Sequence, residues 1–247
     1  MVKNILITGA TSGIGLATAD KLLNEGHHVI ACGRNTEKLT ALKNNFSELE
    51  ILKFDVADPN QVNHTLDKIK ESVDVLINNA GNAHGLDHIQ DGDPDDWDRM
   101  IDSNIRGLLY VTRAILPEMV KRERGEIINI SSISGKEAYA KGTVYCATKF
   151  AVDAITMGMK LDLNEHGIKV TSINPGAVNT NFSKVRFKGD QQKADQVYEG
   201  FKPLSGNDIA EIISFVISLP PHVNISDLTI LPTAQANTSV IDRSGKF

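Results

Sequence analysis

The chain has 247 residues, of which 41% are hydrophobic and 23% charged, and its formal net charge is −5. This length is enough for one large α/β domain, so we predict a single domain over residues 1–247. The acidic balance provides no basic field that would hold nucleic acid or an anionic membrane, and we expect neither partner.

The cysteines and the apolar runs bear on the compartment. Cys32 and Cys146 lie far apart and outside any metal-like spacing, so neither a disulfide framework nor a zinc site is expected. No stretch reaches ~18 uninterrupted apolar residues, and an apolar strand begins too soon after Met1 to leave room for a signal peptide. We therefore expect a cytoplasmic protein.

Strand-like and helical segments alternate along the chain. Strands are expected at residues 5–8, 28–32, 51–54, 73–77, 126–130, 168–173 and 228–231, and helices after Ser12, through Lys43, after Asp58, from 97 to 120, around Tyr145 and from 208 to 219. This alternation predicts a parallel sheet covered by helices on both faces. Residues 181–200 lose clear periodicity, which indicates a mobile surface insert.

Three glycines separate the first strand from the first helix. Gly9, Gly13 and Gly15 are spaced Gly-x-x-x-Gly-x-Gly, which differs from the more familiar Gly-x-Gly-x-x-Gly. Such glycines let the backbone approach a pyrophosphate, which the helix N-terminus then attracts. The alternative is a purely structural turn, but the position directly after the first strand favours dinucleotide binding.

The end of the second strand bears on the choice of nucleotide. An NAD-preferring enzyme would place an acid here for the ribose hydroxyls, whereas this chain has Arg34. A guanidinium matches the oxygens of a 2′-phosphate, so NADP is expected in preference to NAD. The alternative is a solvated surface arginine.

A proton-transfer site is indicated near the middle of the chain. Tyr145 and Lys149 have the i, i+4 spacing that places them on one face of a helix. A neighbouring ammonium favours the phenolate and so lowers the pKa of a tyrosine. Ser132, just past the preceding strand, offers a hydroxyl that could bind a substrate oxygen.

These motifs occur together in a family order. With Thr8-Gly-x-x-x-Gly-x-Gly, Asn78-Asn-Ala-Gly81, Asn104, Ser132, Tyr145-x-x-x-Lys149 and Asn174-Pro-Gly176, the chain resembles the classical short-chain dehydrogenases/reductases over essentially its whole length. The resemblance implies a doubly wound Rossmann-type fold, in which a seven-stranded parallel sheet carries helices on both faces.

The resemblance also implies roles for the motif residues. Ser132 would hydrogen-bond the substrate oxygen, and the family spacing selects it over Ser131. Tyr145 would exchange a proton with that oxygen, while Lys149 would hold the ribose and lower the pKa of Tyr145. Asn104 would hold a water for proton relay, or it would satisfy backbone groups at a helix kink; both roles are compatible.

By this resemblance, the cofactor would be bound by residues that follow the first four strands and the sixth strand, and by the start of the Tyr145 helix. The expected NADP-binding residues are Gly9, Thr11, Ser12, Gly13, Ile14, Gly15, Arg34, Asp55, Val56, Asn79, Ala80, Gly81, Tyr145, Lys149, Pro175, Gly176, Val178 and Thr180. No metal is expected: His84 and His88 have helical spacing, but the glycines and proline around them indicate a loop.

A closer resemblance lies beyond the catalytic motifs. Residues 181–190, with Val185-Arg-Phe-Lys-Gly-Asp190, and residues 219–226 resemble the NADP-dependent 3-hydroxy acid dehydrogenases, a group that includes serine and allo-threonine dehydrogenases. This implies a substrate lid at about 181–200. Arg186 is the candidate clamp for a substrate carboxylate, with Lys184 and Lys188 as rivals; alternatively these are solvated charges, or Arg186 pairs with an acid to fix the lid.

We therefore predict an NADP-dependent oxidoreductase that interconverts 3-hydroxy acids, with serine or allo-threonine as candidates, and 3-oxo acids. The alternatives are reduction of another carbonyl, such as a 3-oxoacyl thioester, a sugar or a small ketone, and a dinucleotide-binding sensor without turnover. By the same resemblance, the helix over residues 107–120 and the Tyr145 helix would pair with copies of themselves in a homodimer or homotetramer. The intact Ser132, Tyr145 and Lys149 favour the enzyme over the sensor.

Overall fold

The computed structural model describes residues 2–46 and 48–247. Its centre is one seven-stranded sheet in the order β3-β2-β1-β4-β5-β6-β7, in which every neighbouring pair is parallel. The strands are β1 (Asn4–Thr8), β2 (His28–Gly33), β3 (Glu50–Lys53), β4 (Val75–Asn78), β5 (Gly125–Ile130), β6 (Ile168–Pro175) and β7 (Asp227–Ile230). The predicted seven-stranded parallel sheet is confirmed.

Helices connect successive strands, as the alternation predicted. They are α1 (Gly13–Asn24), α2 (Thr36–Asn45), α3 (Pro59–Leu66), α4 (Pro94–Ile101), α5 (Gly107–Lys121), α6 (Thr143–Leu163), α7 (Phe182–Arg186), α8 (Gln191–Gln196) and α9 (Gly206–Ser218). A π-helical turn (Asp102–Arg106) joins α4 to α5. Side-chain caps fix several starts; for example, Asp58 accepts hydrogen bonds from the first backbone N–H groups of α3, ahead of Pro59.

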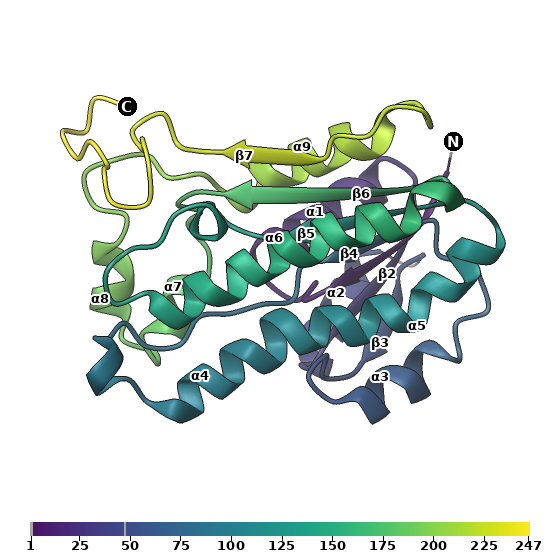
Figure 1. Cartoon of the computed structure of the whole chain (residues 1–247), viewed down its shortest axis with the longest axis horizontal. Helices are drawn as coiled ribbons and strands as arrows, with labels where there is room; N and C mark the ends of the chain where they lie inside the picture. The colour runs from purple at the N-terminus through teal and green to yellow at the C-terminus, as the bar shows by residue number, and fades with distance from the viewer. Residues whose placement is uncertain (1, 47) are drawn as a thin grey trace.

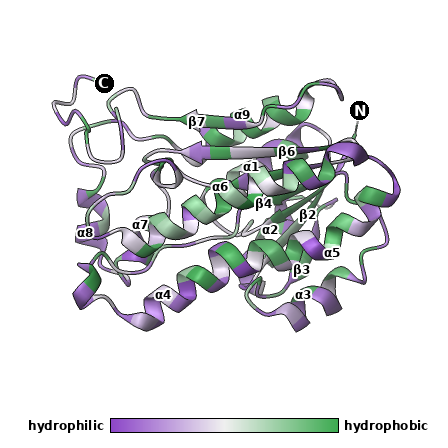
Figure 2. Cartoon of the chain, in the orientation of Figure 1, coloured by the Kyte–Doolittle hydropathy of each residue, from purple (hydrophilic) through white to green (hydrophobic). Residues whose placement is uncertain are grey.

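Alternate residues of the central strands build two hydrophobic cores. Ile5 and Ile7 of β1 point into the core beneath α1, α2 and α9, whereas Leu6 points into the opposite core beneath α3, α5 and α6. Figure 1 shows these layers, with α5 and α6 in front of the sheet and α1 and α9 behind it. The central strands are hydrophobic almost throughout, as Figure 2 shows, because both of their faces are covered.

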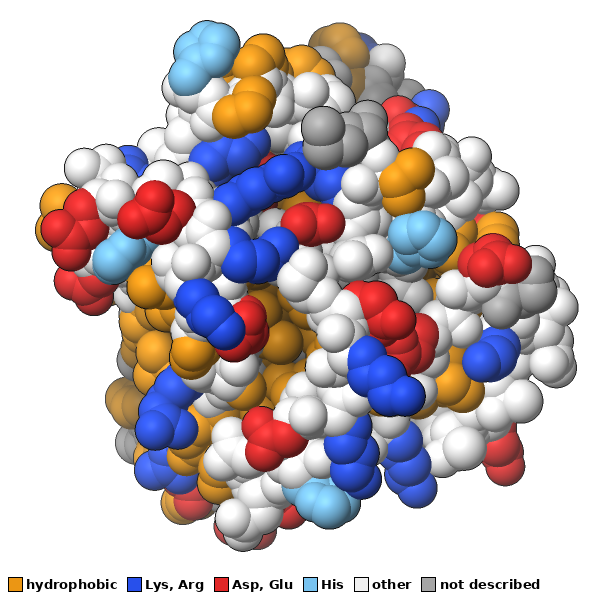
Figure 3. Space-filling model, turned by 90° about the vertical axis from the view of Figure 1, so that its right-hand side faces the viewer, with side chains coloured by type: hydrophobic (Ala, Val, Ile, Leu, Met, Phe, Trp, Pro, Cys, Tyr) orange, Lys and Arg blue, Asp and Glu red, His pale blue; other side chains and the backbone are white. Residues whose placement is uncertain are grey.

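The two ends of the strands differ in character. Ion pairs gather at the amino ends, where Glu126 is bridged by Lys3 (3.4 Å) and Lys169 (3.1 Å). Figure 3 views the molecule from this side and shows basic and acidic side chains mixed over the face. The carboxyl ends lie on the other side of the sheet. The strand order reverses between β1 and β4, and the loops that follow β1, β4, β5 and β6 lie at this edge. Ligand sites of open α/β sheets form at such a point.

Two parts of the chain depart from the sequence prediction. Residues 181–200 contain the two short helices α7 and α8, which the weak periodicity did not predict. The expected helix over 97–120 is interrupted by the π-turn around Asn104. Within the described residues, no helix has the length and apolar character needed to cross a membrane.

Candidate active site

A cavity of about 540 Å³ opens at the carboxyl ends of the strands. It extends from the loop after β1, past the loops after β4 and β5, to the start of α6 and the lid segment. It is lined by all but two of the predicted catalytic, cofactor and substrate residues, namely Gly9, Thr11, Ser12, Gly13, Ile14, Arg34, Asp55, Val56, Asn79, Ala80, Gly81, Ser132, Tyr145, Lys149, Pro175, Gly176, Val178, Thr180 and Arg186. The exceptions are Gly15 and Asn104.

The glycine loop is fitted to close backbone approach. Gly9 has φ +67°, and a Cβ atom there would lie 3.0 Å from the Cα of Ala80; Gly13 has φ +55°, and its Cβ would lie 3.1 Å from the Cβ of Thr180. Side chains at these positions would therefore be strained and would fill the cradle. This geometry, at the N-terminus of α1, fits a pyrophosphate.

Gly15 has a packing role that the sequence did not predict. It does not line the cavity; a Cβ atom on it would lie 2.4 Å from the Nδ2 of Asn79 and 2.5 Å from the carbonyl oxygen of Gly9. Gly15 thus permits α1 to pack against the loops that form the cradle. Its tight contacts are with Asn79 and Gly9 of those loops, and the contact of Gly15 with the cofactor stays a prediction.

Arg34 lines the cavity directly after the end of β2. Its side chain is 72% exposed and its Nη1 lies 3.4 Å from an Asp55 carboxylate oxygen. An exposed guanidinium held loosely at the mouth of the cavity is free to turn toward a phosphate. The neighbouring Lys38 also lines this end and adds a second cation.

The helix α6 brings Tyr145 and Lys149 together, as predicted. Both side chains are buried, and the Lys149 Nζ lies 6.0 Å from the centre of the Tyr145 ring. Nζ donates a hydrogen bond to the carbonyl oxygen of Ile130 at 2.9 Å. Burial lowers the pKa of Lys149 to about 8, and the Asp153 carboxylate opposes the shift only in part.

The pKa of Tyr145 departs from the prediction. Burial raises it above the ordinary value for a tyrosine, and the largest opposing influence is the charge of Arg186. Hydrogen bonding with Ser132 also lowers it. The cation that acts most strongly on the phenol here is therefore on the lid, whereas the sequence pointed to Lys149.

Ser132, and not Ser131, faces Tyr145. The Ser132 hydroxyl caps a short 3-10 turn (Ile133–Gly135), accepts a hydrogen bond from the Ser134 backbone N–H at 3.1 Å and donates to the Pro175 carbonyl oxygen at 3.5 Å. The Ser131 hydroxyl instead donates to the Lys149 carbonyl oxygen at 3.3 Å. Ser134 also lines the cavity and hydrogen-bonds Tyr139.

Asn104 is buried in the π-turn and its amide is fully engaged in structural hydrogen bonds. Its Oδ1 accepts from the Asn82 backbone N–H at 2.8 Å, and its Nδ2 donates to the Asn82 carbonyl oxygen at 2.9 Å and to the Thr148 hydroxyl at 3.0 Å. These contacts match the predicted backbone-satisfying role. A Cβ placed on Gly81 would lie 3.1 Å from Oδ1 and 3.6 Å from the Lys149 Nζ, so Asn104 remains close to Lys149.

The three cationic side chains of the lid, Lys184, Arg186 and Lys188, have different surroundings. Arg186 lines the cavity, with its guanidinium carbon 4.8 Å from the centre of the Tyr145 ring. Lys184 is exposed and lines a different cavity, while Lys188 pairs with the buried carboxylate of Asp96 at 2.9 Å. Of the three predicted candidates, only Arg186 reaches the catalytic end.

Several residues at this end were not predicted. Tyr139 accepts a hydrogen bond from the Arg186 Nη2 at 2.7 Å. Gln235, in the segment after β7, accepts from the Ala177 backbone N–H at 2.8 Å, and Thr238 and Ile241 of the same segment line the cavity. An aromatic residue shortly before Tyr145 was the only sequence signal for Tyr139, and the C-terminal segment offered none.

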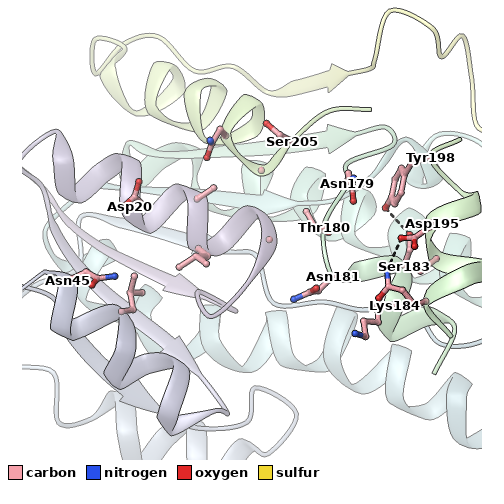
Figure 4. A pocket seen from close by; sticks show the side chains of 18 of the residues that line it. Asp20, Asn45, Asn179, Thr180, Asn181, Ser183, Lys184, Asp195, Tyr198 and Ser205 are labelled. Atoms are coloured by element: carbon pink, nitrogen blue, oxygen red, sulfur yellow. Dashed lines mark hydrogen bonds between the residues drawn. The ribbon is translucent and has the colours of Figure 1, made fainter. Parts of the chain in front are cut away.

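A second cavity, of about 670 Å³, lies behind the lid. Figure 4 shows polar side chains converging on it from α1 (Asp20), from the segment after β6 (Asn179, Thr180) and from the start of α9 (Ser205). Ser183 and Tyr198 share a hydrogen bond of 2.8 Å at its lid side. It shares Gly13, Thr180, Asn181, Ser183 and Tyr198 with the first cavity, but none of Ser132, Tyr145 and Lys149 lines it.

The fold and the Ser132, Tyr145 and Lys149 arrangement define a dinucleotide-binding oxidoreductase of the short-chain type. Comparison with protein families agrees: the short chain dehydrogenase model matches residues 3–191. The chain belongs to the short-chain dehydrogenase family, as the motifs predicted.

Individual relatives are similar along nearly their full length. The chain is 41% identical over 237 residues to the NADP-dependent 3-hydroxy acid dehydrogenase YdfG of Escherichia coli K12, covering 94% of this chain and 96% of the relative. It is 40% identical over 240 residues to the serine 3-dehydrogenase of Rhizobium radiobacter, covering 96% of each chain. Among solved structures, the closed form of a serine dehydrogenase complexed with NADP+ matches with a TM-score of 0.94 at 40% identity, covering 96% of this chain and 98% of that one.

Proposed function

We propose that this protein is an NADP-dependent dehydrogenase that interconverts 3-hydroxy acids, serine among them, and the corresponding 3-oxo acids. The observation that carries the proposal is the placement of Arg186, a cation that contacts the ring of Tyr145 in the same cavity. The names of the full-length relatives at about 40% identity support the same substrate class and cofactor.

The cavity fits NADP by its own features. The glycine cradle would lose its space to any Cβ atom, and the exposed guanidinium of Arg34 follows the second strand and would be available to a 2′-phosphate. Gly9, Gly13 and the N-terminus of α1 would hold the pyrophosphate, Asp55 and Val56 the adenine side, and Lys149 the nicotinamide ribose. The bound nucleotide supplies the nicotinamide carbon that accepts or gives up the hydride.

The residues of the chain would handle the substrate and its proton. In the oxidising direction, the substrate C–H leaves as hydride, the hydroxyl proton moves to the Tyr145 oxygen, and the carbon gains a C=O bond. Ser132 hydrogen-bonds the substrate oxygen and holds it beside Tyr145. In the reducing direction Tyr145 donates that proton, which the phenol carries at neutral pH because burial raises its pKa. Asn104 orients the segment around Asn82 that borders Lys149, and because its side-chain amide is engaged there, the predicted relay water would have to be held by the Asn104 backbone.

Arg186 would bind the substrate carboxylate with its free donors. Its Nε is buried and has no hydrogen-bond partner among the described residues, and no acidic side chain in the described part of the chain lies within ion-pair distance of it. A substrate carboxylate could accept a hydrogen bond from this Nε and a second one from the same guanidinium group.

A substrate panel tests the proposal directly. We expect oxidation of 3-hydroxybutyrate-type acids and of serine with NADP, and a rise of at least about tenfold in KM when the carboxylate is esterified, because a charge-assisted hydrogen bond contributes about 1.5 to 3 kcal/mol. Equal rates with the acid and its ester, or brisk NADPH consumption on neutral ketones alone, would support the alternative of another carbonyl substrate.

The exposed apolar side chains on α5 and α6 support assembly into a homodimer or homotetramer. Leu109 on α5 and Phe150, Met157 and Leu161 on α6 are between 40% and 81% exposed. The residues at 150, 157 and 161 recur at helical spacing and form one apolar strip along α6. A second copy of the chain is the occupant that the family resemblance favours for this surface.

A further inference from the structure

The lid arginine is packed against the acid/base tyrosine. The Arg186 guanidinium carbon lies 4.8 Å from the centre of the Tyr145 ring and 5.1 Å from the centre of the Phe182 ring, and Phe182 in turn packs edge-on against Tyr145 at 5.5 Å. At such distances a cation is attracted to the face of an aromatic ring. The lid therefore holds a permanent positive charge against the ring of Tyr145, the residue that would exchange the proton.

Tyr139 holds this charge in position. Its hydroxyl accepts the hydrogen bond from the Arg186 Nη2 at 2.7 Å, and its ring centre lies 5.8 Å from the guanidinium carbon. The ring is itself fixed, because a Cβ atom on Gly142 would lie only 2.2 Å from it, so the ring packs on the bare backbone of Gly142. The lid backbone is tied down as well, since the Gly85 N–H donates to the Arg186 carbonyl oxygen at 3.0 Å.

We propose that Arg186 has two roles in one site, binding the substrate carboxylate and stabilising the phenolate form of Tyr145, and that Tyr139 is the residue that positions it for both. The first role rests on the function proposed above. The second depends only on the geometry around Tyr145, so the two can fail separately.

The other charged or titratable groups around Tyr145 are less able to supply this effect. From α6, Cys146 is a buried thiol, and Lys149 has a pKa lowered to about 8. From α4, the Asp96 carboxylate is neutralised by Lys188, and burial lowers the pKa of His84 in the loop after β4. Tyr139 is a neutral phenol whose pKa is also raised by burial.

The difference between the two cations matters in the alkaline range. Lys149 loses its charge as the pH passes about 8, whereas a guanidinium stays protonated. Above that pH, Arg186 is the cation that still acts on the Tyr145 oxygen. This agrees with the charge of Arg186 being the largest influence that opposes the raised pKa of Tyr145.

The test compares Arg186→Ala, Arg186→Lys and Tyr139→Phe with the control Lys184→Ala, which removes an exposed cation from the same short helix. Two quantities are followed against pH: kcat/KM for oxidation of a 3-hydroxy acid, and tyrosinate ultraviolet absorbance at saturating NADP+, taken as the difference from the matching protein carrying Tyr145→Phe. An opposite charge at this distance moves a pKa by about 1 to 3 units.

We expect the Tyr145 midpoint to rise by at least about one unit in Arg186→Ala, to recover in part in Arg186→Lys and to stay unchanged in Lys184→Ala. Tyr139→Phe should raise KM severalfold with a smaller change of midpoint. A midpoint that is the same in wild type and Arg186→Ala, or an equal shift in Lys184→Ala, overturns the inference. A shifted absorbance midpoint without oxidation of any hydroxy acid would support the second role and refute the proposed function.

Discussion

Gly15 provides a sharp test of how the nucleotide cradle is built. Gly15→Ala adds one methyl group whose carbon would lie 2.4 Å from the Asn79 Nδ2 and 2.5 Å from the Gly9 carbonyl oxygen. Asn79 cannot simply move aside, because Nδ2 donates to the Thr8 carbonyl oxygen at 2.9 Å and to the Gly9 carbonyl oxygen at 3.2 Å. The substitution must break these bonds or displace the backbone of Gly9.

The loss of stability can be estimated for both outcomes, the broken hydrogen bonds of Asn79 and the displaced backbone of Gly9. Two lost hydrogen bonds cost about 2 kcal/mol in total, and overpacking of a close contact costs about 1 to 3 kcal/mol. The two costs do not add in full, because a shift of Asn79 that breaks the hydrogen bonds also relieves the overpacking. We therefore expect the free energy of unfolding to fall by about 2 to 3 kcal/mol. For a chain of this length, Tm should then fall by about 4 to 12 °C.

The assay combines thermal unfolding with NADPH binding. Gly9 and Asn79 both line the cavity, so their displacement should also weaken NADPH binding by about 5- to 10-fold, equivalent to ~1 to 1.4 kcal/mol. Gly158→Ala is the matched control, since no atom lies within 4 Å of its added Cβ and alanine favours the helix. If Gly15→Ala melted and bound NADPH like the wild type, the assignment of Gly15 to cradle packing would be refuted.

The remaining predictions concern charge and assembly. Arg34→Ala should raise KM for NADP by about 10-fold or more and leave KM for NAD within about twofold, because only NADP carries the 2′-phosphate; equal losses for both would contradict the assignment. Lys149→Met should stabilise the cofactor-free protein at pH 7 by up to about 3 kcal/mol, because the buried ammonium has a pKa of about 8 against 10.5 unfolded. The unfolded chain binds more protons between those values, so wild-type stability rises there and the advantage of the variant should vanish by about pH 10.5 in denaturant titrations; a constant difference would refute this. We propose that copies of the chain associate through α6; light scattering should then show an oligomer for the wild type and for Phe215→Glu, an exposed apolar site on α9, and monomers for Met157→Glu with Leu161→Glu.

The fold could be predicted from the sequence because its signals are local. Each apolar run, such as that around Ile7, is long enough for a strand and is followed by a segment with helical periodicity, and caps such as Asp58-Pro59 mark where helices begin. The short lid helices could not be predicted in this way. The five-residue α7 is stabilised mainly by tertiary contacts of Phe182 and Arg186, and helical periodicity cannot be read over so short a segment.

In the candidate site too, residues with a fixed local spacing could be predicted, and residues placed by tertiary contacts could not. Tyr145, Lys149 and the glycine loop carry a fixed spacing, so the sequence was sufficient to bring them together. The packing of Gly15 against Gly9 and Asn79 was not predicted, because spacing alone does not distinguish a glycine that faces a ligand from one that packs against a neighbouring loop. Tyr139 and Gln235 were missed because their positions depend on contacts made only in the folded chain, with Arg186 and with the backbone of Ala177.

We propose that the Tyr145 hydroxyl transfers the proton during NADP-dependent oxidation of a 3-hydroxy acid. The most direct measurement is the initial rate of oxidation of 3-hydroxy acids and serine isomers, with NADP and NAD side by side, for wild type and Tyr145→Phe. We predict activity with NADP that falls by about 100-fold or more in Tyr145→Phe, while that variant still binds NADPH and keeps its Tm. Retained activity in Tyr145→Phe, or a wild-type protein that oxidises no acid in the panel, would contradict the account.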